Sequence, residues 1–340
     1  MSLNLPLANP PQPAAPSAPS APSAPSAPYE GLPHSRMART SARFATWRPL
    51  LGIPLFVVAF MVSVLLLDVA GYAVGKALGR PERSDGTMNL GVLGDTAHSL
   101  LAIAVTIPVV MLTLRWMERR PGGTVMSVAG RLRWKWQLTC FAVGLPTGAL
   151  LIALTFLTAI GENGGGAEDS GGWAGWDFFL PALVMLVLLV PLQAAAEEVV
   201  FRGWLTQVVG SLTRHPWVPV VVQAPLFAAA HGWGTSSGFI TLTYFGVVAG
   251  WLTYRTGGVE AAIGLHAASN LLSFLLGASI KDGLVSDETA ADASALLAAL
   301  DMGTTTLYAL VVLWLARRWG VQRTRPERDF PVWEASEARS

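Results

Sequence analysis

Apolar positions along the chain gather into eight long runs that short polar breaks separate. The runs cover residues 50–72, 93–114, 137–160, 177–200, 217–232, 238–254, 259–277 and 295–316. An α-helix needs roughly 20 apolar residues to cross the hydrocarbon core of a bilayer, and most of the runs are close to this length. The pattern predicts an all-α fold, a polytopic transmembrane helical bundle of about eight spans.

The composition supports a membrane protein. Of the 340 residues, 52% are hydrophobic and only 13% are charged, whereas a soluble domain carries roughly 25% charged residues. The basic residues are spread along the chain and do not form the single basic patch of a nucleic-acid-binding protein. The one cysteine, Cys140, lies in an apolar run, which excludes a disulfide framework and a Cys-based zinc site. We expect membrane lipid, and no nucleic acid, as a partner.

Basic residues are concentrated in alternate loops. These loops hold 18 of the 23 Lys and Arg residues: Arg36, Arg39, Arg43, Arg48, Arg115, Arg119, Arg120, Arg131, Arg133, Lys135, Arg214, Arg255, Arg317, Arg318, Arg323, Arg325, Arg328 and Arg339. The other loops collect acids such as Glu162, Asp169 and Asp282. Because Lys and Arg favour the cytoplasmic side, we expect a multi-pass protein of the plasma (inner) membrane with both termini in the cytoplasm.

The chain divides by composition into six parts. They are a disordered Pro/Ala/Ser-rich cytoplasmic tail (1–48), N-terminal transmembrane helices (49–160), a glycine-rich flexible outer loop (161–176), a membrane core with the candidate site (177–277), an outer loop with the last transmembrane helix (278–317) and a basic cytoplasmic tail (318–340). The first tail repeats Ala-Pro-Ser between Ala15 and Pro28. Such a segment buries too little apolar surface to offset the entropy of ordering.

Ionisable residues inside apolar runs are costly and point to function unless they lie at an interface. Glu197, Glu198 and Arg202 continue the run that ends near Leu192. Glu198 and Arg202 are four residues apart, share a helix face and can pair. Glu197 points about 100° away, and we expect no partner for it on its own helix. The plain alternative is a surface ion pair at the end of a span, worth well under about 1 kcal/mol.

Two further apolar segments carry polar residues. Phe227 lies one turn before His231, and His266 lies one turn before Asn270 on another helix. A lone buried histidine is more often a satisfied core residue than a catalyst. Two histidines, an asparagine and a double glutamate on three successive segments predict one polar site, and the small alanines around them allow close helix approach.

These residues suit the activation of water for attack on a carbonyl group. A carboxylate shielded from solvent can act as a general base, which is a role for Glu197. One imidazole can hold the water or a metal, while a second imidazole and a carboxamide can donate to an oxyanion. The sequence has no HExxH motif and no GxSxG motif. Asp68 and Asp95 could form an aspartyl dyad, but the residues before Asp95 lack the first glycine of a GxGD pattern.

The three motifs resemble those of the CPBP family, which groups type II CAAX prenyl endopeptidases with Abi-like bacteriocin-processing and immunity proteins. The family motif EExxxR corresponds to residues 197–202, FxxxH to residues 227–231 and HxxxN to residues 266–270. The resemblance covers about residues 177–277. It implies an intramembrane endopeptidase of a membrane-associated or CAAX-type protein substrate.

The resemblance also implies roles for the site residues. Glu197 would activate water with help from His231, and His266 and Asn270 would stabilise the oxyanion. Glu198, Arg202 and Phe227 would support the site. Glu197, His231 and His266 could supply three zinc ligands with an open fourth position, or the same residues could hold a water without metal.

Two other functions stay open at this point. A non-catalytic immunity-type membrane protein would keep the same architecture. A proton-coupled transporter would also bury Glu, His and Arg, but it predicts inverted repeats with broken helices, which the sequence does not show. Because His231 would lie roughly 20 Å along its helix, we further expect the helix of Glu197 to continue to about Leu212, around a cavity open to the cytoplasm.

Overall fold

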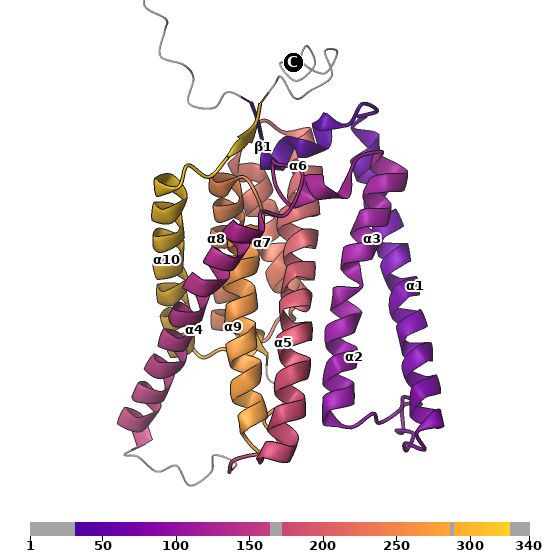
Figure 1. Cartoon of the computed structure of the whole chain (residues 1–340), viewed down its shortest axis with the longest axis vertical. Coiled ribbons are helices and arrows are strands. Elements are labelled where there is room, and N and C mark those ends of the chain that lie inside the picture. The colour runs from indigo at the N-terminus through magenta and orange to yellow at the C-terminus, as the bar shows by residue number, and fades with distance from the viewer. Residues whose placement is uncertain (1–30, 164–171, 286–288, 327–340) are drawn as a thin grey trace, which may run out of the picture.

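The computed structural model describes residues 31–163, 172–285 and 289–326, and these residues form a bundle of long helices (Figure 1). The α-helices are α1 (Trp47–Ala77), α2 (Val92–Ala104), α3 (Thr106–Thr113), α4 (Trp134–Asn163), α5 (Trp176–Glu198), α6 (Thr206–Leu212), α7 (Trp217–Ala230), α8 (Ser236–Thr256), α9 (Glu260–Ser279) and α10 (Ala295–Arg318). Two π-helical segments, η2 (Leu114–Glu118) and η4 (Val199–Leu205), continue α3 and join α5 to α6. The predicted all-α class is confirmed.

Short elements complete the described chain. They are the 3-10 helices η1 (His34–Thr40), η3 (Gly122–Val125) and η5 (Ala290–Asp292), and the antiparallel strands β1 (Leu32–Pro33) and β2 (Thr324–Arg325). The strands join the two ends of the described chain at the end of the bundle that Figure 1 shows at the top.

Fewer helices than the eight predicted runs have both the length and the hydropathy of a membrane span. Six helical stretches in the described chain are long and apolar enough to cross a bilayer: Trp47–Ala77, Val92–Glu118, Trp134–Thr158, Trp176–Leu212, Glu260–Ser279 and Ala295–Arg318. The helix α7 has only 14 residues, which is too short to cross, since about 20 are needed. The helix α8 has 21 residues but is not among these six stretches. Each of the eight predicted runs still overlaps a helix.

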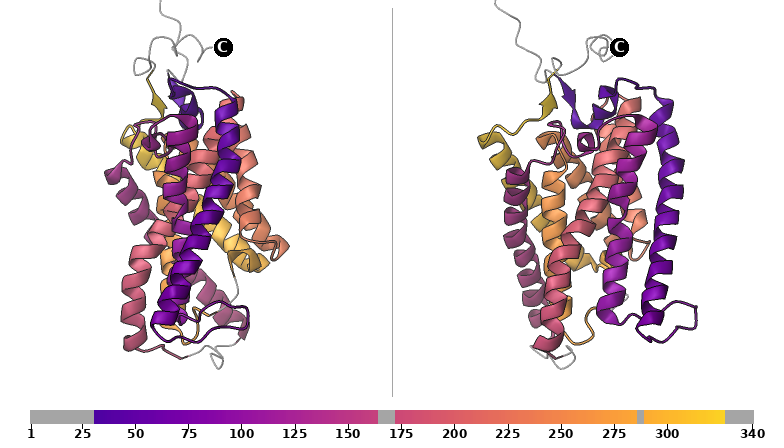
Figure 2. Two further views of the ribbon diagram at one scale, coloured as in Figure 1. Left: turned by 90° about the vertical axis from the view of Figure 1, so that its right-hand side faces the viewer. Right: turned by 45° about the vertical axis from the view of Figure 1, so that its right-hand side comes forward.

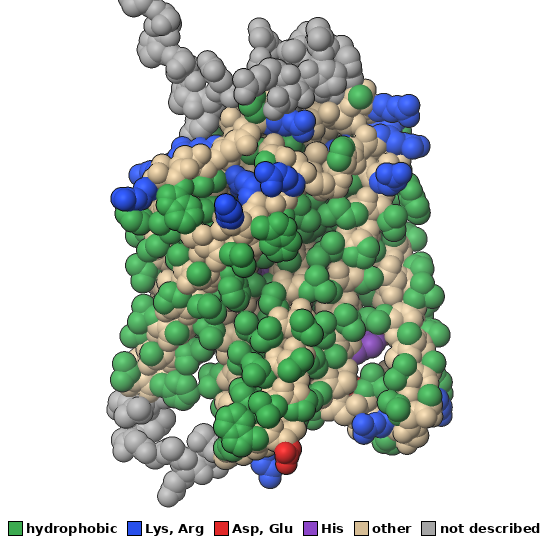
Figure 3. Space-filling model, in the orientation of Figure 1, with side chains coloured by type: hydrophobic (Ala, Val, Ile, Leu, Met, Phe, Trp, Pro, Cys, Tyr) green, Lys and Arg blue, Asp and Glu red, His purple; other side chains and the backbone are tan. Residues whose placement is uncertain are grey.

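The surface of the bundle is divided as a membrane requires. Hydrophobic side chains cover its flank, and Lys and Arg side chains gather at the end that carries η1 and the strands (Figure 3). We call this the basic end. Helix α1 lies at the edge of the bundle in Figure 1 and in the right-hand view of Figure 2, and only 6% of its most apolar window is buried. Its exposed leucines and valines therefore face the hydrocarbon.

Small residues set the place of α9, which carries His266 and Asn270. A Cβ atom on Gly264 would lie 2.6 Å from Cys140 Cβ, and one on Gly144 would lie 2.8 Å from the Gly264 carbonyl oxygen. Real Cβ atoms do not approach so closely, so α4 and α9 pack with their backbones in near contact. This is the small-residue packing that membrane helices use.

The last part of the predicted disordered tail is ordered, contrary to the prediction for residues 1–48. The helix η1 packs against α6, with Met37 fully buried, and Arg39 Nη2 donates to the Ser211 carbonyl oxygen at 2.9 Å. Tertiary contacts with residues far along the chain supply the burial that the local sequence lacks. Residues 1–30, the predicted loop residues 164–171 and the tail residues 327–340 lie outside the described chain.

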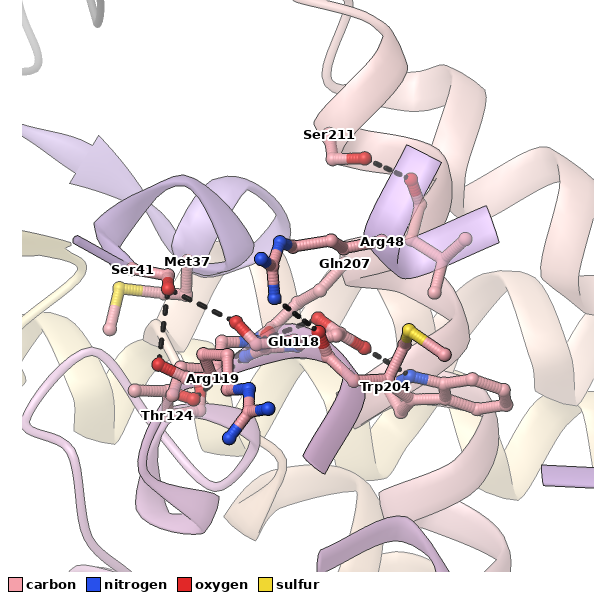
Figure 4. Close-up of polar contacts among 12 residues, drawn as sticks. Met37, Ser41, Arg48, Glu118, Arg119, Thr124, Trp204, Gln207 and Ser211 are labelled. Carbon is pink, nitrogen blue, oxygen red and sulfur yellow. Dashed lines mark hydrogen bonds and ion pairs between the residues drawn. The ribbon is translucent and has the colours of Figure 1, made fainter. Parts of the chain in front are cut away.

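A buried polar network anchors η1 and the helix after the motif glutamates (Figure 4). Glu118 accepts from Trp204 Nε1 at 2.7 Å and from Arg120 Nε at 2.8 Å. Gln207 Nε2 donates to the Thr124 carbonyl oxygen at 2.8 Å and lies 3.2 Å from His34 Nε2. Burial lowers the pKa of His34 from 6.5 to about 4, so His34 is neutral at physiological pH.

Candidate active site

The structure brings together the residues of the three motifs. Glu197 lies near the end of α5, His231 directly follows α7, and His266 lies on α9. His231 Nε2 is 3.8 Å and His266 Nε2 is 3.6 Å from the same atom, Glu197 Oε2. The side chains are 22%, 6% and 12% exposed for His231, His266 and Glu197. Three potential proton donors or acceptors thus converge on one point.

Glu198 connects Arg202 to His266. Its Oε1 atom accepts from Arg202 Nη1 at 2.9 Å, the i to i+4 pair that the spacing predicts, and lies 2.7 Å from His266 Nδ1. The side chains of Glu198 and Arg202 are fully buried. This pair is therefore not the solvent-exposed ion pair at the end of a span that the sequence also allowed. Both charges are buried, so the loss of one partner would leave the other without a compensating charge.

The partners of the two imidazole rings differ. His231 Nδ1 lies 2.9 Å from the Phe227 carbonyl oxygen, which only accepts hydrogen bonds. The neutral His231 ring must therefore carry its proton on Nδ1 and present a bare Nε2 to Glu197. His266 Nδ1 faces the Glu198 carboxylate, so it also carries a proton, and its Nε2 can donate only when the ring is an imidazolium.

Glu197 has a partner on its own helix, contrary to the expectation from the sequence. Gln193, four residues earlier and buried, donates from Nε2 to Glu197 Oε1 at 2.6 Å. Asn270 Nδ2 donates in turn to Gln193 Oε1 at 3.2 Å. Spacing of i and i+4 could have revealed Gln193, since it is a polar residue at the end of an apolar run. Glu197 Oε2 has no hydrogen-bond partner among the described residues.

An aromatic cluster encloses the Arg202 guanidinium. Its carbon Cζ lies 4.0 Å from the ring centroid of Phe227 and 5.3 Å from that of Phe245. The same Phe227 ring is 4.5 Å from the His231 ring, and the Phe245 ring is 5.2 Å from the His266 ring. The faces of these rings stabilise the buried cation. Phe245 was not predicted, because an aromatic residue in an apolar run carries no distinguishing signal.

The helix of the glutamates continues as predicted. It runs without interruption from Trp176 to Leu212, and the expected continuation to about Leu212 is confirmed. The π-helical segment η4 begins directly after Glu198 and contains Arg202. Such segments are rare and are often found at functional sites. The cavity open to the cytoplasm stays a prediction.

The three candidate metal ligands lie slightly further apart than zinc ligands do. Two ligands of a tetrahedral zinc are about 3.4 Å apart, and the imidazole nitrogens of His231 and His266 are 3.8 and 3.6 Å from Glu197 Oε2. Within residues 31–163, 172–285 and 289–326, no group of three His, Cys, Asp or Glu side chains is arranged to hold a metal ion.

The two aspartates on the first spans do not form a dyad. Asp68 lies 3.2 Å from His98 Nε2, and Asp95 lies beside Arg83 at 2.5 Å. Each carboxylate pairs with its own basic residue, and this arrangement does not support a catalytic pair of the two aspartates.

The fold and the site define a polytopic helical membrane protein with one carboxylate and two imidazoles gathered inside its bundle. Residues 176–272, which hold all three motifs, match the family described as type II CAAX prenyl endopeptidase Rce1-like. The resemblance inferred from the motifs is thereby confirmed. The uncharacterized protein YyaK of Bacillus subtilis (strain 168) is 27% identical over 223 residues, which are 63% of this chain and 70% of that protein. No solved structure matches the chain.

Proposed function

We propose that the chain is an intramembrane endopeptidase that hydrolyses a peptide bond of a membrane-associated, CAAX-type protein with a water activated by Glu197. The observation that carries the proposal is the approach of His231 Nε2 and His266 Nε2 to Glu197 Oε2, at 3.8 and 3.6 Å. This geometry lies inside the segment that is similar to the type II CAAX prenyl endopeptidases. Lipid and a membrane-associated protein are the expected partners.

In the proposed reaction, Glu197 Oε2 takes one proton from water while the water oxygen bonds to the carbonyl carbon of the scissile peptide. The bare Nε2 of His231 accepts the other hydrogen of the same water as a hydrogen bond and so orients it. The tetrahedral intermediate then collapses and the C–N bond breaks. The proton held by Glu197 passes to the leaving nitrogen, which restores the carboxylate.

The negative charge on the intermediate needs donors. The His266 ring contacts Glu198 through Nδ1 at 2.7 Å, and its Nε2 would donate to the oxyanion when the ring is an imidazolium. Asn270 Nδ2 supplies a second, neutral donor. Donors fixed before the reaction are worth about 3 to 4 kcal/mol each in related oxyanion sites. Arg202 Nη1 donates to Glu198 Oε1 and holds it in place.

The proposal is tested by the peptide termini that the protein creates in its own membrane. Membrane fractions from cells with the parent chain and with Glu197→Gln are compared by proteomics of protein C-termini. New C-termini that occur only with the parent chain support the proposal. Identical sets of termini refute it and favour a non-catalytic membrane protein, since both chains keep the same fold.

A further inference from the structure

Gln193 connects the proposed base to the proposed oxyanion donor. It lies on α5, and its side chain contacts Glu197 on the same helix and Asn270 on α9. The residue is 5% exposed. None of the three motifs includes this position.

The chemistry of the partners fixes the direction of both hydrogen bonds. An ionised carboxylate only accepts hydrogen bonds, so the amide group of Gln193 that faces Glu197 must be its NH2. The Gln193 carbonyl oxygen therefore faces Asn270, which must offer its own NH2. The charge on Glu197 thus orients both amides in sequence.

The same contacts assign different tasks to the two oxygens of Glu197. Gln193 Nε2 holds Oε1 at 2.6 Å, and Oε2 is left facing His231 and His266. One hydrogen of Asn270 Nδ2 is used by Gln193. The second hydrogen stays available for a peptide oxyanion.

We propose that Gln193 is a positioning residue for the reaction, an inference that rests on the proposed function of this site. Its NH2 group fixes the carboxylate plane of Glu197 so that Oε2 is the reacting oxygen. Its carbonyl oxygen keeps the NH2 of Asn270, rather than the Asn270 carbonyl, turned toward the reaction. Without Gln193 the carboxylate rotates freely, and Asn270 can present an oxygen that repels the oxyanion.

Gln193→Met tests this role, because methionine has nearly the same length and makes neither hydrogen bond. The probe is an internally quenched peptide that ends in a prenylated Cys-aliphatic-aliphatic-X sequence, with enzyme in liposomes. We expect kcat to fall roughly 10- to 100-fold, the scale of a misplaced catalytic group, while KM stays near the parent value. Gln193→Glu, which keeps the side-chain size but cannot donate to Glu197 when ionised, should show the same loss.

Gln223→Met is the matched control. Gln223 is a buried amide on α7 that donates to the Gly246 carbonyl oxygen at 2.7 Å and to the Val220 carbonyl oxygen at 3.0 Å. Its loss removes two buried hydrogen bonds to backbone carbonyl oxygens and none to a side chain of the candidate site, so the variant should melt lower but keep the parental kcat. Gln193→Met combined with Asn270→Ala should lose less than the product of the single losses, since the two residues act as one unit.

The outcomes separate the two claims. No cleavage of the probe by the parent chain, with no new termini in membranes, overturns the proposed function. Cleavage by the parent chain with an unchanged kcat in Gln193→Met overturns the role of Gln193 alone. Independent, multiplicative losses in the double variant overturn it as well.

Discussion

The two adjacent glutamates should respond in opposite ways to the same conservative change. Glu198 is fully buried, accepts from Arg202 at 2.9 Å and lies 2.7 Å from His266 Nδ1. Glu198→Gln keeps the shape but removes the charge, which leaves the guanidinium of Arg202 without a counter-ion. Breaking a buried pair in this way costs about 3 to 5 kcal/mol. We expect the melting temperature to fall by roughly 10 °C.

Glu197→Gln removes a carboxylate whose hydrogen-bond donor among the described residues is the neutral amide of Gln193. The new amide can still accept from Gln193 through its oxygen, and the side chain is 12% exposed. The melting temperature should therefore stay within a few degrees of the parent value. Turnover should drop by roughly 100-fold or more, the usual scale for losing a general base.

The histidines provide matched comparisons for stability. His266→Ala removes one of the two partners of Glu198 and should melt below the parent chain. His231→Ala, whose Nδ1 contacts only a backbone carbonyl oxygen among the described residues, should melt close to it. Both variants should lose turnover.

Thermal melts in detergent and cleavage of the quenched peptide by the same preparations measure both effects. The assignment of roles is refuted if Glu197→Gln melts well below the parent chain while Glu198→Gln melts normally and loses only activity.

Because burial lowers the pKa of His34 to about 4, the contribution of His34 to stability should be complete above pH 6.5 and fall by about 3 kcal/mol toward pH 4. Melting of the parent chain and of His34→Gln as a function of pH checks this. Equal dependence of the two melting temperatures on pH would contradict it. Gly264→Leu should prevent folding, since α4 lies within 3 Å of the new Cβ, whereas Gly303→Ala, with nothing within 4 Å, should fold normally. A zinc chelator should leave the cleavage rate unchanged, and activity that is lost on chelation and returns only with added zinc would contradict a water held by Glu197 and His231 without metal. Reporters fused after Arg120 and after Arg325 should both give a cytoplasmic signal. An external signal from either fusion would contradict the predicted orientation.

The helices and the main site residues could be predicted from the sequence because their signals are local. Apolar runs of bilayer length mark the helices, and ionisable residues inside such runs stand out by their cost. Glu198 and Arg202 pair because four residues make about one helical turn. The continuation of the helix to Leu212 followed from comparing the depths of Glu197 and His231.

Other features depend on contacts between distant segments. The burial of η1 requires the surface of α6, about 170 residues further along the chain. Phe245 reaches Arg202 only because α8 packs against α7 through Gly246, where a Cβ atom would lie 2.8 Å from Ala224. The short length of α7, by contrast, was visible in the pattern, since its apolar run over residues 217–232 has only 16 residues. The hydrogen bond from Gln193 to Glu197 is local, but it was not predicted, because Gln193 carries no charge and does not stand out as an ionisable residue does.

The claim that Glu197 activates water for peptide hydrolysis is tested most directly by one turnover in water enriched in oxygen-18. Excess enzyme is mixed with the quenched peptide, and mass spectrometry measures the masses of the cleavage products and of the enzyme segment that contains Glu197. A general base adds water directly to the substrate, so the new C-terminal carboxylate should carry one heavy oxygen and Glu197 none, and Glu197→Gln should yield no product in the same time. Heavy oxygen in Glu197 with none in the product, or parental product formation by Glu197→Gln, would contradict the account.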